Sequence, residues 1–321
     1  MLFKFSPKLP LFITFFIATC LVMPYSVMAA KRVDINQELR WAASIDDDDA
    51  ISQLLDAGAN PNAANNFGKT ALMNAAENGS ILAISILLSR GADVNIETTV
   101  GCTALTFAAE NGEVEVTALL LERGANLKAR TRSGLNALIL AAQYDLPEMV
   151  DQLLFKGADP DAVEKDGLSA LIVAAGRGHI NSARLLLDNS ANVNLIDNHG
   201  RSALIHAADH GKNIDMAKLL IKHGAKINTP SSDGAAPLLW AAGGGHVKMV
   251  NALLAQGADI EAQDEEGLTA LMEAVSADST ETVKLLLTHG ANIAIINKDG
   301  QNAIDIAIKT NNQKIQALLK K

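Results

Sequence analysis

Short apolar runs recur along this chain at a fixed spacing and predict pairs of short helices. The run TALMNAA begins at residue 70, and related runs begin at residues 103, 136, 169, 202, 236, 269 and 302. A second amphipathic run follows each one and carries a leucine pair, as at Leu87-Leu88 and Leu119-Leu120. We therefore expect two helices in every repeat, with second helices such as residues 81–89 and 114–122, and none longer than about three turns.

Glycines recur in the same phase and mark the boundaries of the predicted helices. One glycine stands two residues before each run, at positions 68, 101, 134, 167, 200, 234, 267 and 300. A Gly-Ala pair follows each second helix at positions 58, 91, 124, 157, 224, 257 and 290, with Ser190-Ala191 in the remaining place. The step is 33 residues, except for one of 34, whose extra residue lies in the turn Gly211-Lys212-Asn213. The chain is thus a tandem array of one supersecondary unit.

Each repeated residue type has a local structural role. Thr70, Thr103 and Ser202 precede first helices, where a side-chain hydroxyl accepts hydrogen bonds from free backbone N–H groups of the first turn. The glycines at positions 79, 112, 178 and 245 are expected to take positive φ in the turn between the two helices. Because such short helices are unstable alone, the array must be held together by stacking of neighbouring units.

The period and its markers together resemble the ankyrin repeat family. The chain is similar to that family over roughly residues 35–321, through the Thr/Ser-Ala/Pro-Leu-x-x-Ala-Ala start and the Gly-Ala-Asp-x-Asn end of each unit. The resemblance implies an all-α solenoid of about nine helix–turn–helix units with hairpin-like loops. It also implies that a partner binds along the concave face of the first helices and on the loop fingers beside it. The chain departs from the family pattern in having Ala in place of Pro everywhere except Pro237, and in lacking the His two residues later.

The first thirty residues differ from the array and have the layout of a secretory signal peptide. Lys4 and Lys8 precede an uncharged run at residues 11–23, and small residues up to Ala30 offer a cleavage site. An uncleaved anchor and a loose lipobox at Cys20 are the alternatives; the 13-residue run is shorter than the ~20 residues that span a bilayer. We predict a signal peptide at 1–30, an N-terminal capping repeat at 31–65, seven central repeats at 66–297 and a C-terminal capping repeat at 298–321.

Composition narrows the function without assigning it. The net charge is −9, and removal of residues 1–30 takes away two lysines and leaves −11. Such an acidic surface repels phosphate backbones, so we expect no nucleic-acid partner, and no membrane contact after cleavage. Cys102 alone remains beyond residue 30 and cannot form an internal disulfide. The chain has no Gly-rich phosphate loop, paired-cysteine metal motif or nucleophile elbow, so we expect no catalysis and no cofactor.

The phase of the repeat selects one position in each predicted first helix that is expected to face a groove. These positions hold Asn74, Phe107, Leu140, Val173, His206, Trp240, Glu273 and Ile306, and one turn later come Tyr144, Arg177 and His210. The apolar members of this set would form a strip in a polar groove, which marks an interaction site. The opposing interpretation turns these side chains inward to fill the core. We predict a monomer that binds a protein partner of unknown identity.

Two charged segments border this predicted groove. Lys128, Arg130 and Arg132 alternate along one finger, which places them on one side of an extended segment. They would grip an acidic partner, or they form an ordinary solvated face. The acidic run at residues 46–49 fits a helix-turn patch better than a calcium site, because adjacent acids cannot all point at one ion.

A histidine pair keeps a different class of function open. His206 and His210 are four residues apart on one predicted helix, next to Asp209 and downstream of His199, so they share a face. Such a set would hold a metal such as zinc, although the spacing gives no fixed third ligand. The leading hypothesis is a periplasmic or secreted protein-binding scaffold. The alternatives are a secreted effector that binds host proteins, and a metal- or small-ligand-binding module.

Overall fold

A computed structural model of the protein describes residues 34–211 and 213–320. The predicted signal peptide, Cys20 and Lys212 lie outside these described residues. The described secondary structure is helical, apart from three isolated β-bridges within the loops that join one repeat to the next. In that part of the chain, no helix has the length and apolar character needed to cross a membrane.

The helices of the described residues form nine consecutive pairs. The first helices are α1 (Ile35–Ser44), α3 (Ala71–Glu77), α5 (Ala104–Asn111), α7 (Ala137–Gln143), α9 (Ala170–Arg177), α11 (Ala203–His210), α13 (Pro237–Gly243), α15 (Ala270–Ser276) and α17 (Ala303–Lys309). The second helices are α2 (Asp48–Asp56), α4 (Ile81–Ser89), α6 (Val114–Glu122), α8 (Pro147–Phe155), α10 (Ile180–Asp188), α12 (Ile214–Lys222), α14 (Val247–Ala255), α16 (Thr280–Thr288) and α18 (Gln313–Leu319). The predicted second helices at residues 81–89 and 114–122 are confirmed.

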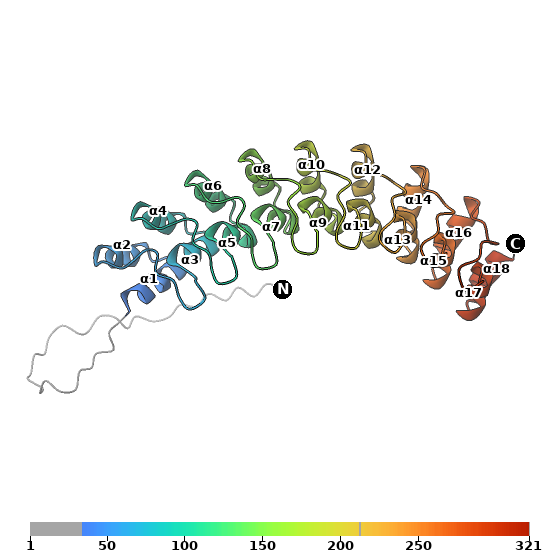
Figure 1. The fold of residues 1–321 in the computed structure, drawn as a ribbon, viewed down its shortest axis with the longest axis horizontal. Helices are drawn as coiled ribbons and strands as arrows, with labels where there is room; N and C mark the ends of the chain where they lie inside the picture. The colour runs from blue at the N-terminus through green and yellow to red at the C-terminus, as the bar shows by residue number, and fades with distance from the viewer. Residues whose placement is uncertain (1–33, 212, 321) are drawn as a thin grey trace, which may run out of the picture. The chain divides into compact units, whose positions relative to one another are not determined.

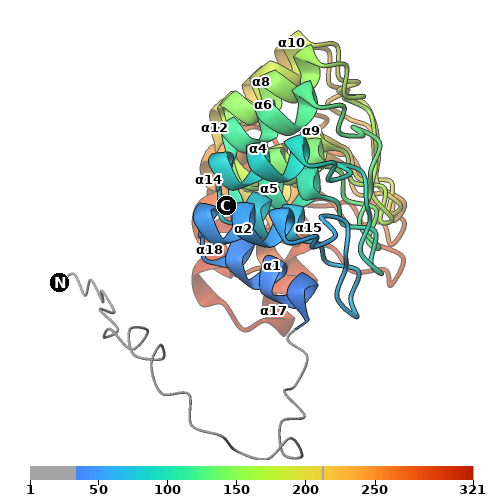
Figure 2. The same cartoon turned by 90° about the vertical axis from the view of Figure 1, so that its left-hand side faces the viewer.

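The pairs stack in order, and each helix contacts its counterpart in the next pair. Within this unit the first helices line the inner side of a curved row and the second helices its outer side (Figure 1). Seen along the row, the joining loops project together at one edge, and we call these loops the fingers (Figure 2). The predicted all-α solenoid of nine helix–turn–helix units is therefore confirmed.

The predicted N-caps hold the starts of the first helices. The hydroxyl of Thr70 accepts from the backbone N–H of Met73 at 3.4 Å, and Ser202 accepts from Ile205 at 3.3 Å. The turn glycines also behave as expected, with φ of 78° at Gly112 and 80° at Gly178. Most first helices therefore begin on a side-chain cap, whereas second helices such as α4 and α6 begin without one.

Alanine and leucine fill the interior of the stack. The consecutive alanines of the first helices, such as Ala75-Ala76 and Ala108-Ala109, have no exposed surface. In most repeats one leucine of the second-helix pair, for example Leu87 or Leu120, is also completely buried, whereas Leu54 and Leu55 of α2 are only partly buried. The small side chains allow neighbouring first helices to approach closely, which aligns them as one continuous inner layer.

Backbone hydrogen bonds tie each finger to the next one. The N–H of Thr99 donates to the carbonyl of Phe67 at 2.9 Å, and that of Arg132 donates to Val100 at 2.6 Å. The same bond recurs once per repeat up to Lys298, whose N–H donates to Glu266 at 2.9 Å. Because every finger is bonded to its neighbour, the edge of the array is an ordered surface and its side chains have fixed relative positions.

The prediction that one position per first helix faces the groove is wrong for two members. Leu140 is only 3% exposed and Ile306 7% exposed. The physical reason is that this position lies over the contact with the preceding first helix: the amide of Asn74 donates to the carbonyl of Arg40 in the previous repeat at 2.8 Å. Trp41, at the same phase in the first described pair, is 58% exposed. The neighbouring helix, more than the phase alone, determines how much of the side chain is covered.

Alanine substitutions at two glycines with nearly equal φ distinguish the energetic cost of backbone strain from that of steric crowding between fingers. Gly101 has φ 79°, and a Cβ placed there would lie 2.4 Å from the carbonyl oxygen of Arg130, whereas Gly124 has φ 81° and open space. Alanine at either position adopts a left-handed conformation that costs about 1–2 kcal/mol. We predict that Gly101→Ala lowers the free energy of unfolding by at least ~1 kcal/mol more than Gly124→Ala, as measured by urea denaturation. Equal losses would contradict tight packing between fingers.

Candidate functional site

The predicted groove residues lie along the first helices but differ in how far they reach solvent. Tyr144, at the end of α7, is 45% exposed, and Arg177 and His210 are also exposed at the ends of α9 and α11. Leu140 is buried. The other predicted residues on the first helices are partly buried, namely Asn74, Phe107, Val173, His206 and Trp240. The inner face therefore combines half-covered aromatic and aliphatic side chains with exposed polar ones.

Two of the aromatic side chains are covered on one side by a cation from the preceding finger. The ammonium of Lys69 lies 4.6 Å from the centroid of the Phe107 ring, and the guanidinium of Arg201 lies 6.0 Å from that of Trp240. Both cations directly follow the finger glycine, so they occupy the same phase of the repeat. Sequence reasoning missed these pairs; the signal for them is a basic residue after that glycine, one repeat before an aromatic residue.

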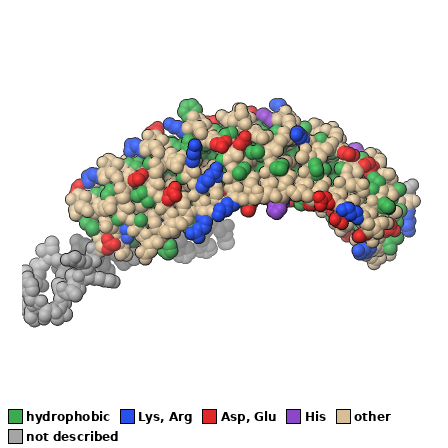
Figure 3. Space-filling model, viewed as in Figure 1, with side chains coloured by type: hydrophobic (Ala, Val, Ile, Leu, Met, Phe, Trp, Pro, Cys, Tyr) green, Lys and Arg blue, Asp and Glu red, His purple; other side chains and the backbone are tan. Residues whose placement is uncertain are grey.

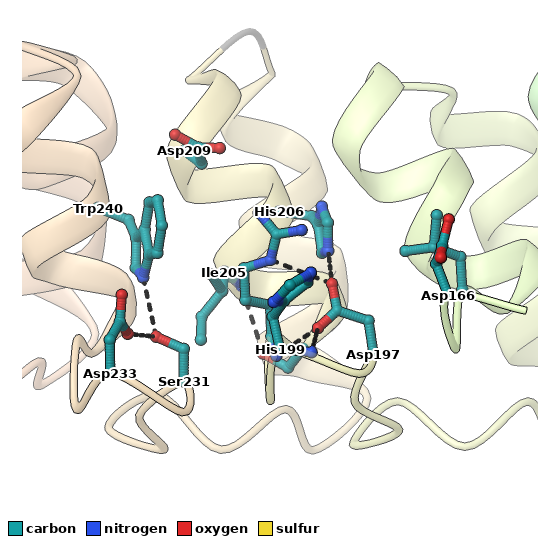
Figure 4. A network of polar contacts seen from close by, with 12 residues as sticks. Asp166, Asp197, His199, Ile205, His206, Asp209, Ser231, Asp233 and Trp240 are labelled. Carbon is teal, nitrogen blue, oxygen red and sulfur yellow. Dashed lines mark hydrogen bonds and ion pairs between the residues drawn. The ribbon is translucent and has the colours of Figure 1, made fainter.

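Asp197, whose side chain is 1% exposed, organises the finger that precedes α11. Its Oδ1 accepts the backbone N–H groups of His199 and Arg201, both at 2.9 Å. Its Oδ2 accepts Nε of Arg201 at 3.1 Å and Nε2 of His206 at 2.9 Å. Figure 4 shows the ring of His206 directed at this carboxylate. The network fixes the position of His206 and holds Arg201 near the Trp240 ring.

The pKa values of Asp197 and His206 are both lowered, which favours a hydrogen bond from a neutral imidazole to an ionised carboxylate at neutral pH. Burial alone would raise the pKa of Asp197, but hydrogen bonds from the backbone of Arg201 and the ring of His206 outweigh it and hold the pKa below its ordinary value. Burial lowers the pKa of His206 and outweighs the opposing effect of Asp197. Asp197 is therefore ionised while His206 is neutral and donates from Nε2.

The metal-site alternative finds no support in this geometry. His206 is directed at Asp197, whereas Nδ1 of His210 lies 3.7 Å from the carboxylate of Asp209 with 43% of its side chain exposed. Among the described residues, no set of three or more His, Cys, Asp or Glu side chains is placed to hold a metal ion. The shared helix face predicted for the two histidines does not bring them to a common ligand.

The basic finger is built differently from the prediction. The guanidinium of Arg130 donates to the carbonyl of Val163 in the following finger at 2.6 Å, whereas that of Arg132 donates to Thr99 in the preceding finger at 3.2 Å. The two guanidinium groups therefore do not converge on one point, because each donates to a backbone carbonyl of a different neighbouring finger. Their charges nevertheless lie at the finger edge, where both residues are exposed.

Two hollows adjoin Trp240 on the inner face. One, of about 220 Å³, is lined by Trp240 together with His199, Arg201 and the finger residues 231–233. The other, of about 330 Å³, lies between α11, α13, α15 and the adjacent fingers; it is lined by Asp209, Asp233, Ala235, Leu239, Trp240, Gly243, Gly244, Asp264 and Glu273. The indole N–H donates to the hydroxyl of Ser231 at 3.2 Å, and that hydroxyl in turn donates to Asp233 (Figure 4). Trp240 is therefore held in place as a wall that both hollows share.

Glu273 is a half-buried acid in the larger hollow. Burial raises the pKa of its carboxyl, and the nearby charges of Asp264 and Asp233 raise it further. No hydrogen bond or ion pair compensates its side chain within the described part of the chain. The phase of the repeat predicts a groove position for Glu273, but it does not group this residue with the other acids, which occupy different phases in three successive repeats.

Charge is distributed unevenly along the fingers. In Figure 3, Lys and Arg side chains gather along the lower edge near the middle of the array, and Asp and Glu gather on the same edge toward the C-terminal end. In the sequence, the fingers before α7 and α9 carry Arg130, Arg132 and Lys165, and the finger before α15 carries Asp264 and the acidic residues 265–266. A partner that lies along this edge would meet both signs of charge.

These features define a class of protein: a solenoid of stacked helix pairs with an inner helical face and an ordered edge of fingers. A family model described as ankyrin repeats (3 copies) matches residues 39–131, 138–231 and 238–321, and another, described as ankyrin repeats (many copies), matches residues 212–254. The chain therefore belongs to the ankyrin repeat family, as its sequence markers indicated. Ankyrin repeats are generally protein–protein interaction modules, and proteins built from them are typically non-enzymatic scaffolds. No curated protein matches the chain.

The raised pKa of Glu273 predicts a pH-dependent gain of stability on removal of its charge. Because the folded state holds this proton more tightly than the unfolded state, the ionised carboxylate opposes folding at neutral pH. Glu273→Gln should raise the midpoint of urea unfolding at pH 7.5. The gain should shrink as the pH falls through the folded-state pKa, where the natural carboxyl becomes protonated.

A matched control for this prediction lies in the same repeat. Glu281 is exposed in the first turn of the outer helix α16. Glu281→Gln makes the same change in net charge and should alter the free energy of unfolding by no more than about 0.5 kcal/mol. A destabilised Glu273→Gln variant at pH 7.5 would contradict the account of an uncompensated carboxylate.

Proposed function

We propose that this protein is a non-enzymatic scaffold that holds a protein partner along its first helices and fingers. The observation that carries the proposal is the placement of Trp240 on the inner face, where it adjoins two hollows and is held by Ser231 and Arg201. Tryptophan is enriched among the residues that contribute most to protein–protein binding, above all when it borders a pocket.

Rigid placement of the inner-face side chains supports this proposal. Trp240 and Phe107 each rest against a cation from the preceding finger, and both sit on short helices locked between neighbours. A side chain that is already ordered loses little conformational freedom when a partner arrives, so more of its contact energy contributes to affinity. Preorganisation of this kind favours a partner-binding role for the face over a purely structural one.

The remaining surface of the inner face has the composition of a protein interface. Exposed Tyr144 and half-buried Val173 supply apolar contact, and Arg177 and His210 supply hydrogen-bond donors beside them. Interfaces typically combine an apolar, partly aromatic centre with a polar rim. We therefore propose that the predicted residues along the first helices from α3 to α13 contact the partner, except Leu140, which belongs to the core of the stack.

The place of action follows from the predicted signal peptide. A chain exported at its first thirty residues would bind its partner in the periplasm or after secretion, and it would do so as a monomer. In the secreted-effector alternative the protein leaves the cell and its partner is a host protein. Cell fractionation distinguishes the two, because a purely periplasmic pool would exclude a role outside the cell.

Removal of both aromatic side chains should separate binding from folding. We predict that the double variant Phe107→Ala, Trp240→Ala keeps nearly all of the helical circular-dichroism signal but loses partner capture from a native periplasmic extract, analysed by mass spectrometry. Neither ring is fully buried, so their loss weakens the stack less than it weakens the inner face.

The control uses an aromatic residue on the opposite side. Phe155, at the end of the outer helix α8, is 86% exposed. Phe155→Ala should leave both the helical signal and the captured proteins unchanged. A large loss of helicity in the double variant would mean that the two rings stabilise the core. Partner capture by the double variant at the level of the unsubstituted protein would contradict binding at the inner face.

A further inference from the structure

The larger hollow beside Trp240 has an apolar floor. Leu239, Trp240 and Ala235 line it, together with Gly243 and Gly244, which add no side chain. Gly243 keeps the floor open: a Cβ there would lie 3.2 Å from Oε2 of Glu273. A flexible chain with an apolar stem would therefore find both contact area and room in a volume of about 330 Å³.

The lining of the same hollow carries charge of only one sign. Its ionisable residues are Asp209, Asp233, Asp264 and Glu273, and no Lys, Arg or His of the described chain lines it. Arg201, whose guanidinium lies 6.0 Å from the centroid of the Trp240 ring, lines the other hollow and is paired with Asp197. Among the described residues, no basic side chain in the lining neutralises the negative charge of the larger hollow.

The four acids differ in how far the fold already uses them. Asp264 accepts the backbone N–H groups of Glu266 and Leu268 at 2.9 and 2.8 Å, and Asp233 accepts the hydroxyl of Ser231. These two maintain the fingers. Glu273 has no such partner among the described residues, and Asp209 has only the exposed side chain of His210 at 3.7 Å. Glu273 and Asp209 therefore have acceptor capacity left for a ligand.

We propose, on the basis of the protein-binding function proposed above, that this hollow receives an arginine or lysine side chain from a basic segment of the partner. The methylene stem would lie on Leu239 and the glycine floor, the cationic head would meet Glu273 and Asp209, and Trp240 would offer its ring. Guanidinium groups stack on indole rings and donate to carboxylates at the same time, which suits this combination of walls.

The arrangement favours a protein cation over a metal ion. A bare divalent cation needs several converging oxygen ligands, and no described set of three acidic or histidine side chains converges in that way. An apolar floor offers no ligand to a hydrated metal ion, whereas the methylene stem of a basic side chain packs favourably against it. Arg132 and Lys165 belong to fingers in the N-terminal half of the array, so a basic segment would be directed to the C-terminal half.

The hollow contains its own reporter of occupancy. The chain has two tryptophans, Trp41 and Trp240. Trp41 is 58% exposed on α1, so Trp41→Phe should be tolerated and leaves Trp240 as the single indole. The purified Trp41→Phe protein is titrated with the acetylated peptide (Arg-Ser)₄ in low salt, and with (Glu-Ser)₄ as the oppositely charged probe. We expect a saturable change in Trp240 emission with the arginine peptide alone, lost at high salt.

Two variants in the same background locate the binding. Glu273→Gln with Asp209→Asn should weaken the arginine peptide about tenfold or more, because two charge-assisted hydrogen bonds are removed. Glu281→Gln on the outer helix of the same repeat should change the affinity less than about twofold, although it also removes one negative charge. The helical circular-dichroism signal of the double variant, compared with that of its parent, distinguishes lost binding from lost folding.

Several results would overturn the proposal. These are the absence of any Trp240 response to the arginine peptide, an equal response to the glutamate peptide, equal weakening by Glu281→Gln, or displacement of the peptide by millimolar CaCl₂ with the same emission change. The two substitutions Glu273→Gln and Asp209→Asn are also introduced into the chain that keeps Trp41. If this variant captures the partner as well as the unsubstituted chain does, the inference is overturned and the protein-binding function still stands. Failure of all partner capture would instead count against the proposed function.

Discussion

The stability of this array rests on contact between first helices that are too short to persist alone. The described first helices have seven to ten residues, well below the length at which an isolated helix is stable in water. In most repeats the first helix has an alanine pair that is buried against the neighbouring repeats, and one buried leucine of the second helix closes the layer beside it. Every repeat therefore depends on the one before and the one after, and the chain behaves as a one-dimensional stack.

The same contact determines what the inner face can present. Because neighbouring first helices approach closely, a side chain at the groove phase lies over the boundary with the preceding repeat. Asn74 uses this place to bond the carbonyl of Arg40, Leu140 is buried there, and Trp240 remains half-covered beside two hollows. Binding chemistry is thus restricted to residues that tolerate partial burial, and Glu273 carries a raised pKa as the consequence.

The fold could be predicted from sequence because its signals are local and repeated. Thr70 as a cap and Gly112 at positive φ need only their own neighbours in the chain. The site was predicted less well, since its contacts join different phases of different repeats. Arg130 and Arg132 bond opposite fingers, Lys69 covers Phe107 from the repeat before, and the acidic hollow combines three repeats. Comparison of one repeat position at a time does not bring such pairs together; the pair of Lys69 and Phe107 is found only when a finger position is compared with a helix position of the next repeat.

The central claim is that partners bind the inner face, and two exposed aromatic residues test it directly. Tyr144 lies at the end of the first helix α7 and Phe155 at the end of the second helix α8, so one repeat offers both sides of the stack. Each is replaced in turn by the photo-crosslinking residue benzoyl-phenylalanine, and the illuminated cells are analysed for covalent adducts. The account predicts adducts with another protein at position 144 and none at position 155. Adducts at position 155 alone would contradict it.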